Sequence, residues 1–388
     1  MVGKQVLIVG GGIAGLLTAW ALARRGIGVT VFEQGPLPNP HCSSFDEHRI
    51  IRHAYGAMSG YARLIPGTFA LWERLWADLG ARHYEETGAA YFLRDDDTWY
   101  EPSVRSLQEL GIGYRDVPLD QVPARYPMTN MAGLTRVVET EGAGMLFPAA
   151  IMTALVAALP GMGVRLAASC RVTAMDADGG TVTADGERHQ GDAVVVAAGA
   201  WVDRLVPSLR GVAVPSRQAV VYLAPPADLA AAWTAAPVML NRSRAGGSYT
   251  LPPRRGTRLK VGDHVFSRQG NPDDDRVARP EDLERLLPAL ATAFHGIGRY
   301  AVLERRACFY TVSEDERFIV RTTGAKAWVI SACSGHGFKL APAMAEAVAA
   351  ALAGERPADE IAAWAAPLAT PPMTDRQTPP LTHLETLA

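Results

Sequence analysis

The hydrophobic positions of the first 35 residues follow the pattern of a strand, a helix and a second strand. A continuous apolar run at residues 5–9 predicts a buried parallel strand, and an Ala- and Leu-rich segment at 16–25 predicts a helix that ends at Gly26. A β-rich run at 29–33 completes the order that a βαβ unit requires. Because a glycine-rich turn at 10–15 joins the first strand to the helix, we expect the two strands to lie parallel.

Two further kinds of pattern alternate along the rest of the chain. Segments that resemble the N-terminal unit comprise helices at 148–160 and 341–353 and strands at 164–173, 192–198 and 328–332, with a hairpin strand at 181–184. The other kind fills residues 85–140 and 214–311. It consists of short β-rich pieces, several of them interrupted by prolines, and one polar helix near 280–295.

These patterns predict an α/β fold with two domains that interleave along the chain. The first is a discontinuous Rossmann-like domain at residues 1–84, 142–213 and 312–365. The second is an α+β domain based on an antiparallel sheet, at residues 85–141 and 214–311. The Pro- and Thr-rich residues 366–388 are expected to form a loose C-terminal tail.

Composition and charge narrow the class of partner. The chain has 388 residues, 48% of them hydrophobic, and a formal net charge of −2, as is typical of a globular protein with substantial cores. No long basic run indicates nucleic acid or an anionic membrane, and the apolar stretches are too short to span a bilayer. Because a strand pattern begins at residue 5, we expect no signal peptide. We expect a cytoplasmic protein, a monomer or weak homo-oligomer, with a small molecule as its partner.

The cysteines give no sign of a metal or disulfide framework. The four of them, Cys42, Cys170, Cys308 and Cys333, lack the short paired spacings of zinc sites and disulfide scaffolds. We therefore expect no metal and a reducing compartment.

The turn at 10–15 has the glycine spacing that binds a dinucleotide. Gly10 permits the tight turn, Gly12 lets the backbone approach a pyrophosphate, and Gly15 allows close packing of the helix. The helix N-terminus offers N–H groups to phosphates, and Glu33, which ends the second strand, is placed to bind a ribose. FAD and NAD share this pattern. Because no second fingerprint follows, a flavin at this site would pass its electrons to oxygen or to another protein.

Two later turns are candidates for further cofactor contacts. The strand at 192–198 is followed by Gly199 and Trp201, where the backbone can approach a cofactor and the indole can cover it, although an ordinary turn after a buried strand explains the segment equally well. The turn with Gly335 and Gly337 offers backbone N–H groups to an electron-rich group, and Lys339 adds a charge. Taken alone, it could be no more than the beginning of a helix.

Four separated motifs make a resemblance specific. They are Arg49-Ile50-Ile51-Arg52-His53-Ala54-Tyr55-Gly56, Leu259-Lys260-Val261-Gly262-Asp263-His264, Cys308-Phe309-Tyr310-Thr311 with Asp315, Phe318 and Ile319, and Gly335-His336-Gly337-Phe338-Lys339. In this order and spacing they resemble the monomeric sarcosine oxidase family, within the glycine- and D-amino-acid-oxidase-like flavoenzymes. The similarity extends from residue 4 to about residue 353. It implies that the Rossmann-like domain binds FAD and that the other domain binds the substrate.

The resemblance also implies residue roles. Cys308 would carry the flavin as a thioether, and Lys260 would promote the reaction with oxygen, because a fixed ammonium stabilises the charge that oxygen gains. Arg52 and Lys339 would hold a substrate carboxylate. The remaining implied contacts are Arg49 beside the flavin ring, Tyr249 and His264 in the active site, and Val172 and Phe338 at the cofactor. The alternatives are a buried structural cysteine, a surface lysine and arginines in surface salt bridges.

The sequence departs from the family pattern at two places. Phe45 stands where small-substrate members carry a histidine, and Ser313-Glu314 replaces a Thr-Pro pair. Phe45 is expected to face the flavin from the substrate side and to make that pocket drier. These departures leave the substrate open while the flavin chemistry is retained.

The sequence therefore predicts an FAD-dependent oxidase of a secondary amine, such as an N-methyl or cyclic amino acid. Hydride transfer would give an imine, and reoxidation by oxygen would give hydrogen peroxide. Two alternatives stay open: a biosynthetic amine oxidase or desaturase acting on a larger substrate, and a flavoprotein subunit that passes electrons to a partner protein.

Overall fold

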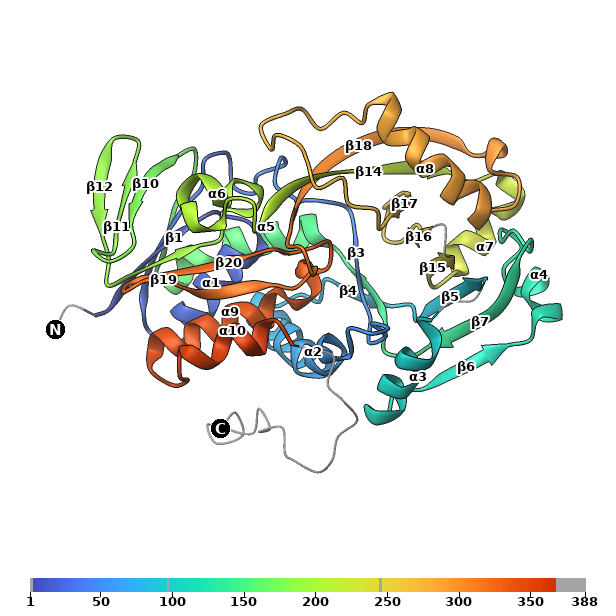
Figure 1. Cartoon of the computed structure of the whole chain (residues 1–388), viewed down its shortest axis with the longest axis horizontal. Coiled ribbons are helices and arrows are strands. Elements are labelled where there is room, and N and C mark those ends of the chain that lie inside the picture. The colour runs from blue at the N-terminus through green and yellow to red at the C-terminus, as the bar shows by residue number, and fades with distance from the viewer. Residues whose placement is uncertain (1–2, 96–97, 244–245, 368–388) are drawn as a thin grey trace.

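The computed structural model describes residues 3–95, 98–243 and 246–367 (Figure 1). The tail predicted at 366–388 lies outside the described residues from residue 368 onward. None of the described helices is long and apolar enough to cross a membrane.

A six-stranded sheet forms one half of the fold. Its order is β19 (Ile319–Gly324), β20 (Ala327–Ser331), β13 (Ala193–Val196), β1 (Gln5–Val9), β2 (Gly28–Phe32) and β9 (Val164–Ala167). Neighbouring strands are parallel except for the pair β19 and β20. The sequence thus predicted the βαβ unit and most of this sheet correctly.

Both faces of this sheet are covered, which explains the continuous apolar runs of its strands. Val6 and Ile8 of β1 pack against the helices α1 (Ile13–Ala23), α2 (Ser59–Leu79), α5 (Pro148–Ala158) and α9 (Gly337–Ala353). Leu7 and Val9 point to the opposite face. There they pack against the small sheet of β10 (Val172–Asp176), β11 (Thr181–Ala184) and β12 (Glu187–Gln190).

The segment 164–173, predicted as one strand, is divided between two sheets. Its first part is β9 in the parallel sheet, and its last residues begin β10 in the three-stranded sheet. Between them Ser169 adopts a positive φ of 52°, and its N–H bonds to the carbonyl of Gly35 at 2.7 Å. The prediction of a single strand was wrong because this turn bonds to the residues that follow β2.

An eight-stranded sheet forms the other half. Its order is β18 (Ala301–Val312), β14 (Val214–Ala224), β17 (Leu259–Asp263), β16 (Gly246–Leu251), β15 (Val238–Ser243), β5 (Ala89–Arg94), β7 (Leu134–Thr140) and β6 (Tyr114–Val117). Two distant chain segments meet in the parallel pair of β15 and β5, and the other neighbours are antiparallel. Helix α8 (Pro280–Ala293) covers one face, which leaves the other face toward the six-stranded half (Figure 1).

Two elements between these halves were not predicted. The short sheet of β3 (Arg49–Ile51), β8 (Gly144–Leu146) and β4 (Tyr84–Glu86) lies between the larger sheets. Helix α2 has 21 residues although it contains Pro66, and it buries Tyr61, Trp72 and Trp76 against the parallel half. A proline followed by Gly67 obscures its helical pattern in the sequence.

Candidate active site

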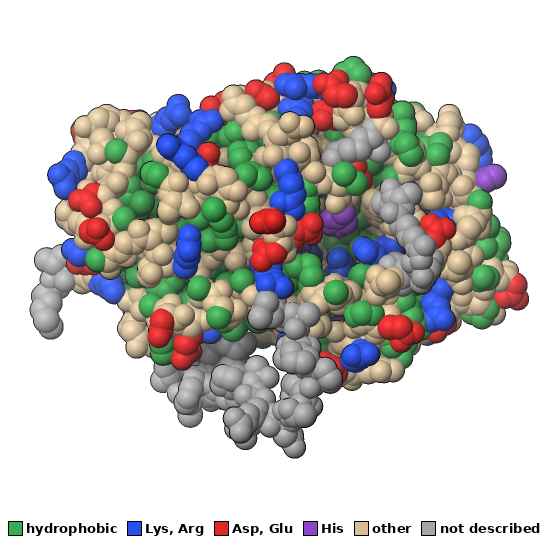
Figure 2. Space-filling view, in the orientation of Figure 1, with side chains coloured by type: hydrophobic (Ala, Val, Ile, Leu, Met, Phe, Trp, Pro, Cys, Tyr) green, Lys and Arg blue, Asp and Glu red, His purple; other side chains and the backbone are tan. Residues whose placement is uncertain are grey.

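A cavity of about 410 Å³ lies between the carboxyl ends of the parallel strands and the uncovered face of the eight-stranded sheet. Residues that follow β1, β2, β13 and β20 line one end of it, and residues of β16, β17 and β18 line the other. Figure 2 shows a hollow in the middle of the molecule in which Lys or Arg and His side chains are visible. Open parallel sheets bind ligands at this place, beyond the carboxyl ends of their strands.

The glycines of the first turn allow the backbone to come close, as the sequence predicted. Gly10 has a φ of 109°, and a Cβ atom on it would lie 2.4 Å from the carbonyl oxygen of Ala197. A Cβ atom on Gly15 would lie 1.9 Å from the carbonyl oxygen of Gly10, so only glycine permits this helix to begin here. Gly10 and Gly12 line the cavity, whereas Gly15 shapes the turn from behind.

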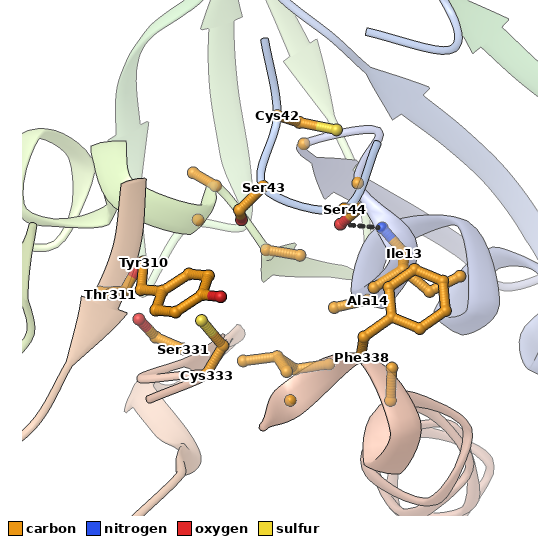
Figure 3. A pocket seen from close by; sticks show the side chains of 18 of the residues that line it. Ile13, Ala14, Cys42, Ser43, Ser44, Tyr310, Thr311, Ser331, Cys333 and Phe338 are labelled. Atoms are coloured by element: carbon orange, nitrogen blue, oxygen red, sulfur yellow. Dashed lines mark hydrogen bonds between the residues drawn. The ribbon is translucent and has the colours of Figure 1, made fainter. Parts of the chain in front are cut away.

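The N-terminus of α1 points at the cavity with most of its N–H groups available. The hydroxyl of Ser44 accepts a hydrogen bond from the N–H of Ile13 at 3.0 Å (Figure 3). Phe338 lies beside Ile13 and Ala14 at this end of the cavity (Figure 3). Helix N-termini of this kind bind phosphate groups.

Glu33 is buried and its carboxylate is held by three donors. One oxygen accepts the N–H of Gly11 at 2.7 Å, and the other accepts the N–H of Gly35 at 3.0 Å and the Asn39 amide at 2.9 Å. Glu33 lines the cavity, as do Val172, Gly199 and Trp201, which the sequence also assigned to the cofactor. A fixed carboxylate beside a helix N-terminus and a backbone without side chains fits the ribose and pyrophosphate of a dinucleotide.

The other end of the cavity is rich in positive charge. Arg49 and Lys260 lie on its wall, and both form ion pairs with Asp46, whose side chain is buried. Burial and the nearby charge of Arg49 lower the pKa of Lys260 well below its ordinary value, and the Asp46 carboxylate opposes both effects. Lys260 is therefore a buried residue of the cavity wall and not a solvated surface lysine.

Arg52 and Lys339 also meet at this end, from opposite ends of the chain. The Arg52 guanidinium lies 4.9 Å from the centre of the Tyr55 ring, and the Lys339 ammonium lies 5.4 Å from it. Neither forms an ion pair within the described residues, and Nη1 of Arg52 is buried without a hydrogen-bond partner. The ammonium of Lys339 donates to the carbonyl of His336 at 3.4 Å. The site thus holds two cations without a protein counter-charge.

Tyr249 and His264 line the cavity beside these cations, with ring centres 5.4 Å apart. The His264 ring is open to the cavity but lies deep within the protein, and this burial, with the charges of Arg52 and Lys339, lowers its pKa to about 3. Burial raises the pKa of Tyr249 to about 12. Both side chains are therefore uncharged near neutral pH.

The turn between β20 and α9 carries the last predicted contacts. Gly335 has a φ of 72°, and a Cβ atom on Gly337 would lie 2.7 Å from that of Cys333. Both glycines and Phe338 line the cavity. The sequence assignment of this turn to the cavity agrees with its geometry.

Two predicted residues are not on the cavity wall. Phe45 precedes Asp46 and does not line the cavity, so the structure does not support a substrate-facing role for its ring. Cys308 lies two residues before Tyr310, which does line it, and so shares its side of β18. Cys333 lines the cavity and lies beside Tyr310 (Figure 3).

Several residues on or behind the cavity wall were not recognised in the sequence. Asp46 lies behind the wall and carries no local signal, because its partner Lys260 is 214 positions away. Ser44 and Asn39 belong to a loop without a regular pattern, in which no spacing marks them. Tyr310 stands in the motif Cys308-Phe309-Tyr310-Thr311, in which the resemblance implies a role only for the cysteine.

The fold and the cavity define a dinucleotide-binding oxidoreductase. Residues 5–351 match the family described as DAO, FAD dependent oxidoreductase, and the chain belongs to that family. N-methyl-L-tryptophan oxidase of Yersinia pestis (strain Pestoides F) is 27% identical over 373 residues, which cover 91% of this chain and 95% of the relative.

Solved structures show the same fold. NikD, described as an unusual amino acid oxidase essential for nikkomycin biosynthesis, has a TM-score of 0.77 at 21% identity, covering 94% of this chain and 98% of that chain. Glycine oxidase from Geobacillus kaustophilus has a TM-score of 0.74 at 19% identity, covering 92% and 96%. The resemblance, the fold class and the FAD-dependent oxidoreductase class predicted from the sequence are confirmed.

Proposed function

We propose that the protein oxidises the C–N bond of a secondary amine that carries a carboxylate, such as an N-methyl or cyclic amino acid, with oxygen as the electron acceptor. Bound FAD supplies the acceptor for a hydride. The curated relative and the solved structures named above are oxidases of amino acids or N-methyl amino acids by their own descriptions. A cytoplasmic enzyme that is a monomer or a weak homo-oligomer belongs to the same proposal, and its four cysteines are free.

The observation that carries the proposal is the pair of cations that lack a counter-charge. Arg52 offers a planar fork of donors and Lys339 a compact ammonium, the arrangement that holds a carboxylate. Burial and the charge of Arg52 lower the pKa of Lys339 well below its ordinary value. A substrate carboxylate placed between them would supply the missing negative charge and favour the protonated lysine.

The surroundings of this pair favour a neutral amine. Among the described residues that line the cavity, the one carboxylate is Glu33, at the nucleotide end. With His264 and Tyr249 uncharged, nothing on this wall compensates an ammonium, so the substrate binds as the free amine. It loses two electrons and two protons to become an imine, oxygen takes both to become hydrogen peroxide, and water hydrolyses the imine.

Arg52 and Lys339 are called the carboxylate clamp below, and the cavity wall beside this clamp is apolar. Ile50 of β3, Leu240 of β15 and Leu251 of β16 line the cavity near Tyr249. Side chains of this kind exclude water and accommodate an apolar substituent of the amine or of the α-carbon. We therefore expect larger N-methyl amino acids to bind more tightly than N-methylglycine.

Clamp variants test the amino-acid assignment. Arg52→Ala and Lys339→Ala should each weaken binding of a carboxylate-bearing substrate by about 2 kcal/mol or more, because the remaining cation is left poorly paired. A neutral amine of the same size should bind as it does to the wild type. Binding is measured by anaerobic titration of the flavin absorbance with N-methyl amino acids, cyclic amino acids and matched neutral amines. Lys326→Ala, which removes an exposed lysine, is the control.

An unchanged preference for acids over neutral amines in both clamp variants would overturn the carboxylate assignment. Turnover of neutral amines alone would favour the specialised amine oxidase in its place. Absence of peroxide, with electrons passed only to an added acceptor, would instead favour a flavoprotein subunit that passes electrons to a partner protein.

We further propose that Cys308 carries the flavin covalently. Burial raises the pKa of its thiol, and the charges of Arg49 and Lys260 oppose this effect and favour the reactive thiolate. The flavin should therefore stay with the polypeptide after acid precipitation, and Cys308→Ala should release it. Cys333→Ala is the matched control, because the Cys333 thiol lines the cavity. Retention of the flavin in Cys308→Ala and its release in Cys333→Ala would assign the bond to Cys333.

A further inference from the structure

Asp46 lies directly behind the cation-rich wall of the cavity and has no role in the function proposed above. Its carboxylate contacts the ammonium of Lys260, the guanidinium of Arg49 and the hydroxyl of Tyr222. The N–H of Glu47 donates to the same carboxylate at 2.7 Å. The residue is 6% exposed, and Lys260 is 1% exposed, so all of these contacts lie inside the protein.

The use of lysine at this position matters in an arginine-rich chain. The sequence holds four lysines, Lys4, Lys260, Lys326 and Lys339, among 38 basic residues, and two of the four line the cavity. Burial deprotonates a lysine far more readily than an arginine. A buried lysine beside Arg49 therefore retains its charge only when a carboxylate compensates both.

We propose that Asp46 is a positioning residue that keeps Lys260 protonated and directs its ammonium at the wall of the cavity. This inference rests on the oxygen-reacting role proposed for Lys260. Without Asp46, Lys260 would lose its proton more readily, and the neutral amine could no longer stabilise the negative charge that oxygen gains. Asp46 thus sets the pH range in which the oxidative half-reaction has its cation.

Other charged or titratable groups face Lys260 from every neighbouring element, and Asp46 is the one that contacts its ammonium. They are Glu47, His48 and Arg49 around β3, Tyr222 of β14, Tyr249 of β16, and Arg306 and Cys308 of β18. Glu47 is committed to Arg258, with which it makes an ion pair. Asp46 is therefore the carboxylate in direct contact with the Lys260 ammonium, while Glu47 favours the charged form from further away.

A merely structural role would be served by the backbone contacts of this loop. The carbonyl of Asp46 accepts the N–H of Ala149 at 3.0 Å, and Arg49 donates to the carbonyl of Ser43 at 2.8 Å. Asp46→Asn keeps the size of the side chain and these contacts while it removes the charge. The substitution therefore separates electrostatic support from structural support.

The protonation state of Lys260 can be read directly, because four lysines give four signals. We suggest ¹³C NMR of the flavin-loaded protein with labelled lysine, titrated from pH 6 to 10, with Lys260→Met to assign the signal. In the wild type, the Lys260 signal should be that of an ammonium at neutral pH, because the Asp46 carboxylate contacts it. An uncharged Lys260 at neutral pH in the wild type would overturn the inference without the use of any Asp46 variant.

In Asp46→Asn the pKa of Lys260 should fall further below its ordinary value, since an uncompensated buried ammonium then lies beside Arg49. Glu139→Gln is the matched control: Glu139 is a carboxylate that pairs with Arg115 and Arg125 and accepts the hydroxyl of Tyr126, away from the cavity. It should leave the Lys260 signal unchanged. An unchanged Lys260 pKa in Asp46→Asn would refute the proposal.

Flavin reoxidation by oxygen, followed across the same pH range, should be flat in the wild type and should decline with rising pH in Asp46→Asn. If the NMR shift appears and reoxidation does not follow it, Asp46 controls the charge of Lys260 as inferred and the oxygen role of Lys260 fails. The two parts of the argument therefore fail separately.

Discussion

The two ends of the cavity, the nucleotide end around Glu33 and the reaction end around Lys260, are formed by different kinds of contact. At the nucleotide end the contacts come mainly from backbone N–H groups of residues near one another in sequence, such as Gly11 and Gly35 around Glu33. At the reaction end they come from charged side chains that are far apart, such as Asp46 and Lys260. The nucleotide end has a backbone geometry that many dinucleotide-binding proteins share. The second end depends on a balance of charges specific to its reaction.

The charges differ as well. At the nucleotide end one carboxylate accepts hydrogen bonds from three uncharged donors, whereas at the reaction end Arg49, Arg52, Lys260 and Lys339 line the cavity and the Asp46 carboxylate behind the wall pairs with Arg49 and Lys260. This excess of positive charge has no counterpart in the formal net charge of −2 of the whole chain. A binding site for anionic groups is thus invisible in the composition.

The largest effect is expected at the nucleotide end, from a single methyl group. Gly15→Ala would place a Cβ atom 1.9 Å from the carbonyl of Gly10, so the turn must open. We expect colourless protein that retains no flavin, measured by absorbance at 450 nm after gel filtration. Gly161→Ala, whose added Cβ would meet no atom within 4 Å, should bind the normal amount of flavin. Full flavin content in Gly15→Ala would mean that this turn does not shape the cofactor site.

A smaller and more selective effect is expected at the reaction end. Lys260→Met should slow the reaction of the reduced flavin with oxygen by about a hundredfold or more, the scale of losing one preorganised charge-stabilising group. Reduction by substrate should change only a few-fold, because Arg52 and Lys339 are untouched. Stopped-flow measurement of the two half-reactions distinguishes these effects. Equal slowing of both half-reactions would contradict the separate roles of Lys260 in reoxidation and of Arg52 and Lys339 in substrate binding.

Acid should destabilise the reaction end through His48. The imidazole is fully buried, and this burial, with the charge of Lys260, lowers its pKa to about 4 from an ordinary value of 6.5. The unfolded chain therefore binds the proton more tightly, and stability is lost as the pH falls from 6.5 to 4, by about 3 kcal/mol for this residue.

His48→Gln keeps a donor toward the carbonyl of Arg258, which His48 contacts at 2.9 Å, but does not titrate. Urea unfolding at pH 7 and at pH 4.5 should show a loss of stability that is smaller by about 2 kcal/mol in the variant. The same loss in both proteins would show that His48 is not the acid-sensitive group.

The accuracy of the sequence predictions also differs between contacts near in sequence and contacts far apart in sequence. Periodicity was sufficient for β1, α1, β2 and β13, because each has a continuous apolar run that packs on neighbouring elements. It failed for the segment 164–173, because the break at Ser169 depends on a bond to Gly35, a residue of another segment. It also gave no helix at α2, where Pro66 lies within the first turns.

At the site, the glycine fingerprint identified the nucleotide end by physical reasoning alone. The residues of the reaction end were predicted only through the resemblance to a known family. That resemblance did not identify Asp46, whose partners Lys260 and Tyr222 are 214 and 176 positions away. No local pattern can indicate such a pairing, because the fold alone brings the groups together. The misplacement of Phe45 has the same origin, since the direction of a loop side chain is not set by its position in a motif.

The pairing of β15 with β5 has a consequence for how the enzyme is made. It joins residues 238–242 to residues 89–93, and the parallel sheet needs β20, at residues 327–331, beside β13. Neither sheet is complete until most of the chain has left the ribosome. Contacts of such large sequence separation slow folding, because the loops between them must close first. We therefore expect the cofactor to enter a finished chain after synthesis, and a shortage of flavin in the cell to leave a folded protein that is still able to take it up.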